Sequence, residues 1–505
     1  MSTLHAKAAE AYQQKPEVVE RHDNTFFGVR QKRDRMAQAL PEWEDLRAAA
    51  SQIKKHTVTH LADYLEQFEQ QARNNGVHVH WAKDADDYNA IVYGILSAHD
   101  VKKVVKSKSM LTEECHLNEN LERRGIEVIE TDLGERILQM MKLAPSHIVM
   151  PALHVHREDI GDTFRRLIPD FDEIAQTYPS NLKSQISNLK PQTSNLKSQI
   201  SARPKDACYQ RDARNLKSSN DPTFLTYVAR MHLRRQFMEA DAGMTGANFG
   251  IAATGDVVVC TNEGNADMST AIPKLHIVSM GIEKLIPNYE AMGVFQRLLA
   301  RNGTGQETTV YTSHFRGPRP GGEMHIILVD NGRSTILGNA EHWQTLKCMR
   351  CGACMNTCPV YRRSAGYSYT YFIPGPIGIN LGMLRNPQQY SDNVSACSLC
   401  CSCDNVCPVQ VDLSTQVYRW RQQLDKLGKA DPMKKIMSRG MSFLFDRPAL
   451  YKAALWMSPA VNWLPGALIE GGMNPWAYGH TMMKFPKKSF HEQWHDLQEK
   501  EVINR

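Results

Sequence analysis

The chain has 505 residues, a net charge of +6 at pH 7 and 42% hydrophobic residues. This length allows two or three folded domains, and no apolar run approaches the roughly 20 residues that span a bilayer. The positive charge is spread along the chain, so it is poor evidence for nucleic-acid binding and only hints at an acidic partner or a membrane surface.

The amino-terminal part of the chain is predicted to be helical. Residues 1–55 are polar and charged, with stretches rich in Ala, Arg and Glu, and we expect them to form helices on the next domain. From Leu61, apolar residues recur at helical spacing, and Gly76 supplies a common carboxyl-terminal stop.

Strands and helices then alternate. The pattern predicts a strand at 77–81, a helix at 85–97, a strand at 102–106, a helix ending before Gly125, a strand at 126–129, a further helix and a strand at 147–150. Such alternation is typical of a parallel sheet covered on both faces. Residues 56–340 are therefore predicted to form one α/β domain.

A low-complexity insert interrupts this domain at residues 180–220. The octapeptide Ser-Asn-Leu-Lys-Ser-Gln-Ile-Ser occurs at 180–187 and again at 194–201, with a fragment at 215–218. The segment has too few apolar residues to bury a core, which predicts a surface loop. A docking tail is the alternative, although nothing in the repeat carries chemistry.

Two polar turns are candidates for a ligand site. After a helix near 224–240 and a glycine-rich segment at 243–250, a buried strand at 257–260 opens into Asn262 and Glu263, and further strands follow at 275–279 and 324–329. The turn Lys106-Ser107-Lys108 also leaves a strand. Open α/β sheets bind ligands at such strand ends, so these five residues could converge on an anionic ligand.

The alternative for these turns is purely structural, with solvated lysines. No Gly-x-Gly-x-x-Gly pattern follows a strand, so the sequence predicts no dinucleotide site of the Rossmann kind.

Cysteines then recur in two copies of one pattern. The first run is Cys348, Cys351, Cys354 and Cys358-Pro, and the second is Cys397, Cys400, Cys403 and Cys407-Pro. This is the spacing of a bacterial two-cluster ferredoxin, in which three close cysteines hold one [4Fe–4S] cluster and the fourth reaches the other. We therefore assign Cys348, Cys351, Cys354 and Cys407 to cluster 1, and Cys397, Cys400, Cys403 and Cys358 to cluster 2.

Other uses of these cysteines are less consistent with the pattern. Zinc sites use paired cysteines but do not account for two four-cysteine runs that each end in Cys-Pro. Disulfides are disfavoured because the chain shows no signal peptide, which indicates the reducing cytoplasm or the inner face of the membrane. Cys401, directly after Cys400, is interpreted as a spare thiol, with a replacement ligand as the alternative.

Residues 341–430 are thus predicted to be a mainly helical domain that holds two [4Fe–4S] clusters. An amphipathic helix from Leu413, preceded by Asp412 and stopped by Gly428, is expected to pack on it. The amphipathic tail at 431–505 mixes large apolar residues with lysines and arginines. It is either a contact for a partner or a membrane surface, or an apolar tail folded back on the protein.

Five short segments carry a resemblance to a known family: Lys106-Ser-Lys-Ser-Met110, Glu130-Thr-Asp-Leu-Gly-Glu135, Pro145-Ser-His-Ile148, Thr245-Gly-Ala-Asn-Phe249 and Thr261-Asn-Glu-Gly-Asn265. With the double cysteine motif behind them, they closely resemble the bacterial lactate utilisation iron–sulfur proteins. The resemblance implies an LUD domain similar in fold to the NagB/RpiA/CoA-transferase group. It also implies a cysteine-rich partner and a smaller LUD-domain partner in the oxidation of L-lactate to pyruvate. The insert and the Cys400-Cys401 doublet depart from the family pattern, and neither removes a ligand.

The favoured function is an electron-transfer subunit of a lactate-oxidising complex, with its electron acceptor unassigned. Two adjacent clusters could take the two electrons of a 2-hydroxy acid one at a time. One alternative is a module that binds a carboxylate or acyl ligand and has structural clusters. Another is a CoA-transferase-like enzyme with Glu263 as nucleophile.

Overall fold

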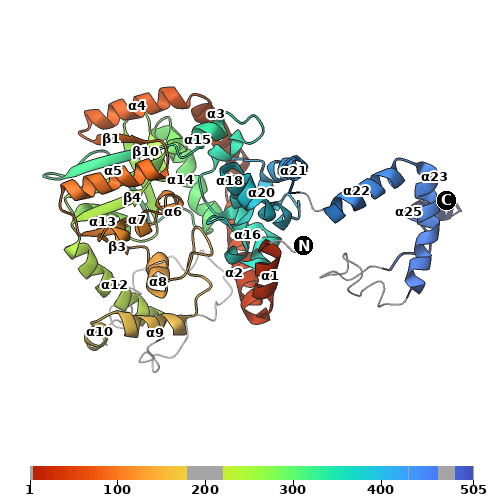
Figure 1. Cartoon of the computed structure of the whole chain (residues 1–505), viewed down its shortest axis with the longest axis horizontal. Helices are drawn as coiled ribbons and strands as arrows, with labels where there is room; N and C mark the ends of the chain where they lie inside the picture. Colours follow the sequence, from red (N-terminus) through yellow and green to blue (C-terminus); the bar gives the residue numbers. More distant parts are fainter. Residues whose placement is uncertain (1–3, 179–219, 430–431, 465–483, 504–505) are drawn as a thin grey trace, which may run out of the picture. The chain divides into compact units, whose positions relative to one another are not determined.

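The computed structural model describes residues 4–178, 220–429, 432–464 and 484–503 (Figure 1). The chain divides into two compact units, residues 2–426 and residues 427–505. The repeat insert expected at 180–220 lies outside the described residues except for Asn220.

The larger unit is built on a six-stranded parallel sheet. Its order is β1 (His78–Ala82), β10 (Glu323–Val329), β7 (Leu275–Gly281), β4 (Ala242–Gly246), β2 (Lys103–Lys106) and β3 (Glu127–Glu130). The prediction of a parallel α/β domain is confirmed, and so are the expected strands near 77–81, 102–106, 126–129, 275–279 and 324–329.

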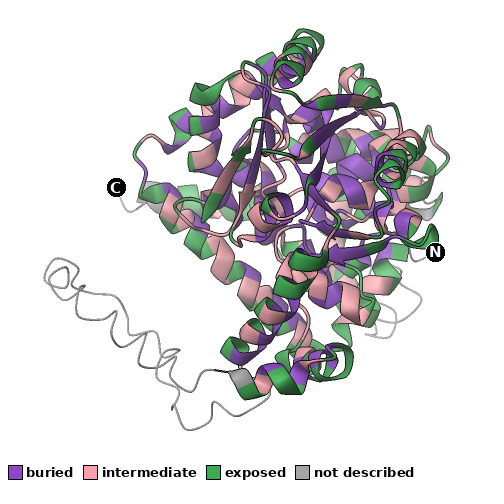
Figure 2. Cartoon of the chain, turned by 90° about the vertical axis from the view of Figure 1, so that its left-hand side faces the viewer, coloured by how far each residue is buried: buried purple, intermediate pink, exposed green. Residues whose placement is uncertain are grey.

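Apolar helices cover both faces of this sheet, and buried residues gather in the sheet and against it (Figure 2). On one face α5 (Ala85–Ala98), α6 (Met110–Glu114) and α7 (Leu117–Arg123) bury Tyr88, Val92 and Leu121 against the strands. On the other face lie α4 (Leu61–Asn74), α12 (Pro222–Glu239), α13 (Asn265–Ala271) and a second sheet. Burial of this apolar area is the main stabilising term of the fold.

The second sheet has the order β8 (Leu285–Ile286), β5 (Phe249–Ile251), β6 (Asp256–Thr261) and β9 (Tyr311–Phe315). The strand expected at 257–260 is confirmed as β6. The glycine-rich segment at 243–250 contains parts of β4 and β5. Glycine is needed at Gly243 and Gly246, because neighbouring backbone or side-chain atoms leave little or no room there for a Cβ. Further elements of this part are α8 (Leu133–Met141), α9 (Arg157–Leu167), α10 (Phe171–Thr177), η2 (Ile282–Lys284), α14 (Tyr289–Gly303) and α15 (Arg333–Leu337).

The strand expected at 147–150 is wrong. Nδ1 of the buried His147 accepts the amide N–H groups of Val149 at 3.0 Å and Met150 at 3.1 Å. These local bonds fold the segment into a turn, so its amides are not available to a strand partner.

The amino-terminal helices are α1 (Leu4–Gln13), α2 (Pro16–Gln38) and α3 (Trp43–Thr59). Both α2 and α3 pack on α14 of the α/β part. They also contact the cysteine segment: α2 packs against α16 (Ala353–Thr357) and α17 (Pro359–Ser364), and α3 packs against η3 (Trp343–Lys347). They therefore touch both parts, and not only the α/β domain as expected.

The cysteine segment is mainly helical. It continues with η4 (Gly366–Ser368), α18 (Gly375–Arg385), α19 (Pro387–Tyr390), η5 (Ser391–Ala396), α20 (Ser402–Val406) and α21 (Leu413–Gln423). The helix expected from Leu413 is confirmed as α21, which ends at Gln423, before the predicted stop at Gly428.

The second unit contains α22 (Pro432–Phe445), α23 (Pro448–Met457), η6 (Ser458–Trp463) and α25 (Phe490–Ile503). Large apolar side chains are exposed on it, including Trp456 at 83% and Trp463 at 89%. Among the described residues, no helix combines the length and apolar character needed to cross a bilayer.

Candidate functional site

The two cysteine motifs adopt the same local backbone. Arg350 and Leu399, which follow the first cysteines, both have positive φ angles, of 61° and 54°. The amide of Arg350 donates to Cys348 Sγ at 3.4 Å, and the amide of Leu399 donates to Cys397 Sγ at 3.3 Å. Each loop thus curls around its first sulfur and offers it an N–H group, as cluster-binding loops do.

The fourth cysteine of each motif leads out of its loop. Cys358 caps α17, with its Sγ accepting the amide of Tyr361 at 3.5 Å, and Cys407 Sγ accepts the amide of Val411 at 3.4 Å. The carbonyl of Cys407 is held by the buried Arg47 of α3, whose guanidinium donates to it at 3.0 and 3.1 Å. The turn after each fourth cysteine is therefore held by a hydrogen bond to its sulfur, and the turn at Cys407 is held at its carbonyl as well.

Electrostatic interactions link each fourth cysteine to the other motif. Burial, together with the charges of Cys348 and Cys407, raises the pKa of Cys351 to about 12. Burial, together with the charges of Cys397 and Cys400, likewise raises the pKa of Cys358 to about 11. Because burial disfavours bare thiolates here, ionised sulfur at these positions needs a cationic partner. The donor set fits iron–sulfur clusters in this respect.

The two motifs differ in their exposure. Cys403 and Cys407 are buried, whereas Cys400 and Cys401 are exposed. Cys401 has a φ of 59° and precedes α20, just as Gly352, with a φ of 79°, precedes α16. Cys401 therefore stands where the first motif has its glycine, and its Sγ accepts the hydroxyl of Ser414 at 3.5 Å.

A cavity of about 340 Å³ lies at the carboxyl ends of β2, β4 and β7. This edge is where open parallel sheets bind ligands. The cysteine segment lines part of the same cavity through Arg350, Cys351 and Ile373. A ligand in the cavity would therefore lie beside the first cysteine motif.

Three of the five predicted ligand residues line this cavity: Lys108, Asn262 and Glu263. Lys106 is fully buried within β2, pairs with Glu130 at 2.7 Å and is not among the lining residues. Ser107 is also buried and does not line the cavity. The chain leaves the sheet only after these two residues, so Lys108 is the first side chain to reach the edge.

The charge of the cavity depends on Glu263. Burial and then the charge of Asp132 raise the pKa of Glu263 to about 7, while the amide of Leu133 donates to Oε2 at 3.2 Å. Lys108 is paired with Glu135 at 2.9 Å. A carboxyl group that titrates near neutral pH can exchange a proton with a ligand, and such groups cluster at functional sites.

Three cationic lining residues were missed from the sequence. Arg333 is buried and pairs with Glu283 at 2.5 Å and Glu114 at 3.0 Å. Burial lowers the pKa of Lys284 to about 8, and the charges of Glu283, Arg350 and Cys348 also act on it. Arg350 has a buried Nη1 without a hydrogen-bond partner among the described residues. The polar turn after the strand at 324–329 could have indicated Arg333, but no local pattern marks the other two.

Two family models match the chain. The LUD domain matches residues 65–334, and the 4Fe-4S dicluster domain matches residues 344–411. The chain is 36% identical to "Lactate utilization protein B" of Oceanobacillus iheyensis, over 93% of this chain and 91% of the relative. It is also 36% identical to "Uncharacterized electron transport protein YkgF" of Escherichia coli, over 88% and 85% of the two chains.

Among solved structures, a DUF162 family protein from Deinococcus radiodurans matches 53% of this chain and 98% of its own length. The sequence identity is 12% and the TM-score is 0.26.

Proposed function

The chain belongs to the LUD-domain family that includes lactate utilisation protein B, and from this premise we propose that it is the electron-transfer subunit of a complex oxidising L-lactate to pyruvate. It is a lactate-utilisation iron–sulfur protein with a parallel-sheet LUD domain followed by a helical dicluster domain. That domain carries two [4Fe–4S] clusters. Such clusters accept and release one electron at a time.

In this proposal, Cys348, Cys351, Cys354 and Cys407 hold cluster 1, and Cys397, Cys400, Cys403 and Cys358 hold cluster 2. The charge of Cys407 acts on the buried Cys351, and the charges of Cys397 and Cys400 act on the buried Cys358, which supports this crossed assignment. The matched N–H donors to the first sulfurs support the use of both loops in the same way.

The contact of Cys351 with the cavity carries the functional proposal. A substrate in the cavity would lie next to cluster 1, and the exposed Cys400 brings cluster 2 near the surface. Electrons would then enter at cluster 1 and leave from cluster 2. Short distances between donor, clusters and acceptor are what stepwise electron transfer requires.

The lining residues suit a small organic acid. Lys284 and Arg350 supply positive charge beside the cysteine motif, where a carboxylate would be held. Glu263 and Asp132 supply oxygen atoms that can accept a substrate hydroxyl. The volume of about 340 Å³ also lies within the range for larger ligands, which favours an acyl-carboxylate binding module as the second candidate function.

We further propose that a partner supplies the primary oxidant, because no dinucleotide fingerprint is found in the sequence. The partners would be a cysteine-rich subunit and a smaller LUD-domain subunit, in the cytoplasm or at the inner face of the membrane. The exposed Ile436, Phe443 and Trp456 of the second unit would supply the membrane or partner contact. Flotation with anionic vesicles, compared between the wild type and Trp456→Ser, tests the membrane contact.

The decisive experiment follows cluster absorbance under anaerobic conditions. With both clusters intact, the isolated chain should not be reduced by L-lactate, and adding the two partners should restore reduction. With partners present, Glu263→Gln should change the rate of reduction, and Glu290→Gln, an exposed control on α14, should not.

Two results would contradict the proposal. Rapid bleaching of the isolated chain by L-lactate would place the whole oxidation site in this chain. Reduction by dithionite, but never by lactate with the partners, would instead favour the binding module. Equilibrium dialysis against lactate and against an acyl-CoA then separates the two candidate ligands.

A further inference from the structure

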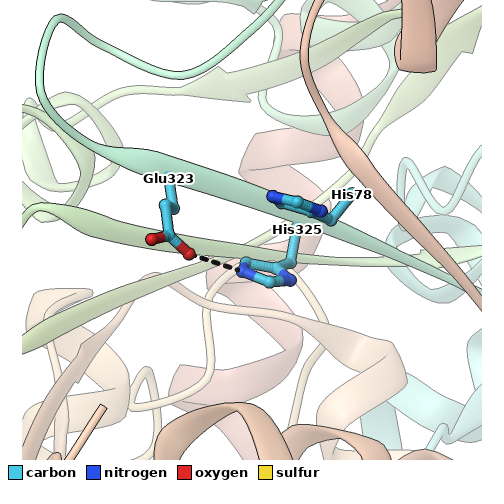
Figure 3. A group of neighbouring side chains, drawn as sticks. All are labelled: His78, Glu323 and His325. Atoms are coloured by element: carbon cyan, nitrogen blue, oxygen red, sulfur yellow. Dashed lines mark ion pairs between the residues drawn. The ribbon is translucent and has the colours of Figure 1, made fainter. Parts of the chain in front are cut away.

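A second group of polar side chains lies at the opposite end of the parallel sheet. His78 begins β1, and Glu323 and His325 lie at the start of β10, its neighbour in the sheet. His78 and His325 are direct register partners, and side chains two residues apart share a face, so all three point to the side covered by α5. Figure 3 shows the ring of His78 over that of His325, with Glu323 directed at His325.

The three ligand atoms are close enough to share one ion. One nitrogen of each histidine and one oxygen of Glu323 all lie within 4.8 Å of one another. His325 Nε2 and Glu323 Oε2 are 3.5 Å apart. A tetrahedral zinc ion with bonds near 2.1 Å has ligand-to-ligand distances of about 3.4 Å. The pair is therefore already at the right spacing, and His78 and Glu323 are exposed and free to adjust.

His325 is the fixed member of the group. Its side chain is only 7% exposed, and its Nε2 is buried without a hydrogen-bond partner among the described residues. Its nearest polar neighbour is Glu323 Oε2 at 3.5 Å, which is too long for a strong hydrogen bond, so a cation bound between the two atoms would satisfy this nitrogen better. It points toward Glu323, while the ring of His78 stacks over that of His325 with centroids 4.8 Å apart, so the exposed His78 side chain must turn for its nitrogen to reach the same ion.

The surrounding residues orient the ligands as metal sites require. His325 Nδ1 is 3.0 Å from His80 Nε2, and a proton on Nδ1 leaves the lone pair of Nε2 free to bind a cation. His99, directly after α5, lies with its Nε2 3.1 Å from Glu323 Oε2. Ligating histidines and carboxylates normally have such outer hydrogen bonds.

We propose that His78, Glu323 and His325 form a site for a divalent transition-metal ion of the zinc class, with His80 and His99 as positioning residues. Two imidazoles and one carboxylate suit zinc and leave a fourth position for water. The site is separate from the clusters, because β10 runs about 20 Å from Glu323 to its far end near the cavity. Its ligands are nitrogen and oxygen, whereas those of the clusters are sulfur.

Zinc binding to the full, cluster-loaded chain tests this proposal. We expect about one tightly bound zinc ion per chain by equilibrium dialysis, with a zinc-edge absorption spectrum that contains only nitrogen and oxygen neighbours. Affinity should fall at least about tenfold in His78→Ala and Glu323→Gln, both changes of exposed residues. The matched control is His56→Ala, which removes one ring of an exposed, tilted pair of histidines outside this group, His56 and His60, whose ring centroids are 4.4 Å apart.

Iron content and cluster absorbance report whether each variant is folded. Wild-type affinity in His56→Ala, with loss in the two site variants, supports the site. Zinc surrounded by sulfur, no tight zinc in the wild type, or wild-type affinity in Glu323→Gln would overturn it.

Discussion

Replacing Glu263 by Gln tests whether the cavity contains a carboxyl group that resists ionisation. Burial, and then the charge of Asp132, raise the pKa of Glu263 from 4.5 to about 7 in the folded protein. The protonated form therefore favours folding, and its stabilisation is complete below pH 4.5 and lost as the pH rises through 7. Each unit of pKa shift corresponds to about 1.4 kcal/mol, so the wild type should lose up to about 3 kcal/mol over this range.

Glutamine keeps the oxygen that accepts the amide of Leu133 but cannot ionise. Compared with the wild type, Glu263→Gln should thus gain about 2 kcal/mol of stability between pH 5.5 and pH 8. For a unit of this size the gain corresponds to a relative rise in melting midpoint of about 2 °C. Melting is followed at one scan rate for both proteins, because the midpoint of an irreversible transition depends on the scan rate.

Glu290→Gln, on the exposed side of α14, is the control and should show the same midpoint difference at both pH values. An equal effect of Glu263→Gln at pH 5.5 and pH 8 would refute the raised pKa. It would also remove the reason for assigning this residue a proton-exchanging role in the cavity.

Four further predictions concern the clusters. After anaerobic purification the chain should hold about eight iron and eight sulfide ions, whereas a folded preparation with zinc alone would contradict the ligand assignment. Cys407→Ser should perturb mainly cluster 1 in electron paramagnetic resonance spectra, and Cys401→Gly should keep both clusters and gain about 1 kcal/mol by relieving a positive φ. Loss of a cluster in Cys401→Gly would show that Cys401 is a ligand. Arg47→Met should lower the free energy of unfolding by about 2–4 kcal/mol and speed the loss of clusters, because it removes the donors to the carbonyl of Cys407. Arg47→Lys should retain part of the wild-type stability. An unchanged melting midpoint in Arg47→Met would contradict this prediction.

The parallel sheet was predictable because its strands are short apolar runs between helical segments, a pattern that depends on local sequence alone. The false strand at 147–150 has the same apolar character, but the ring of His147 competes for its amides. The side chains at the strand ends that reach the cavity were predicted less well than the strands themselves. Lys106 and Lys108 are two residues apart, and only packing around the sheet edge sends Lys106 to Glu130 and Lys108 to the cavity.

The other half of the cavity could not be predicted from local sequence. Arg350 and Lys284 are far apart in the chain, and they meet only because the cysteine segment folds back over the strand ends. The cysteine spacing indicates clusters without showing that the first motif faces a cavity. The positive φ shared by Gly352 and Cys401 also becomes visible only when the two loops are compared in three dimensions.

The bond from Arg47 to the carbonyl of Cys407 joins residues separated by 360 positions in the chain. During synthesis the helix that carries Arg47 is made long before Cys407. Nη1 of Arg47 can pair with Glu44 of the same helix at once, but Nε and Nη2 gain the carbonyl of Cys407 only after the last cysteine motif has been made. Closure of this contact and iron loading at Cys407 then depend on the same turn. The bound clusters would thereby hold the amino-terminal helices in place. A protein that has lost its iron should expose these helices to proteases before its sheet unfolds.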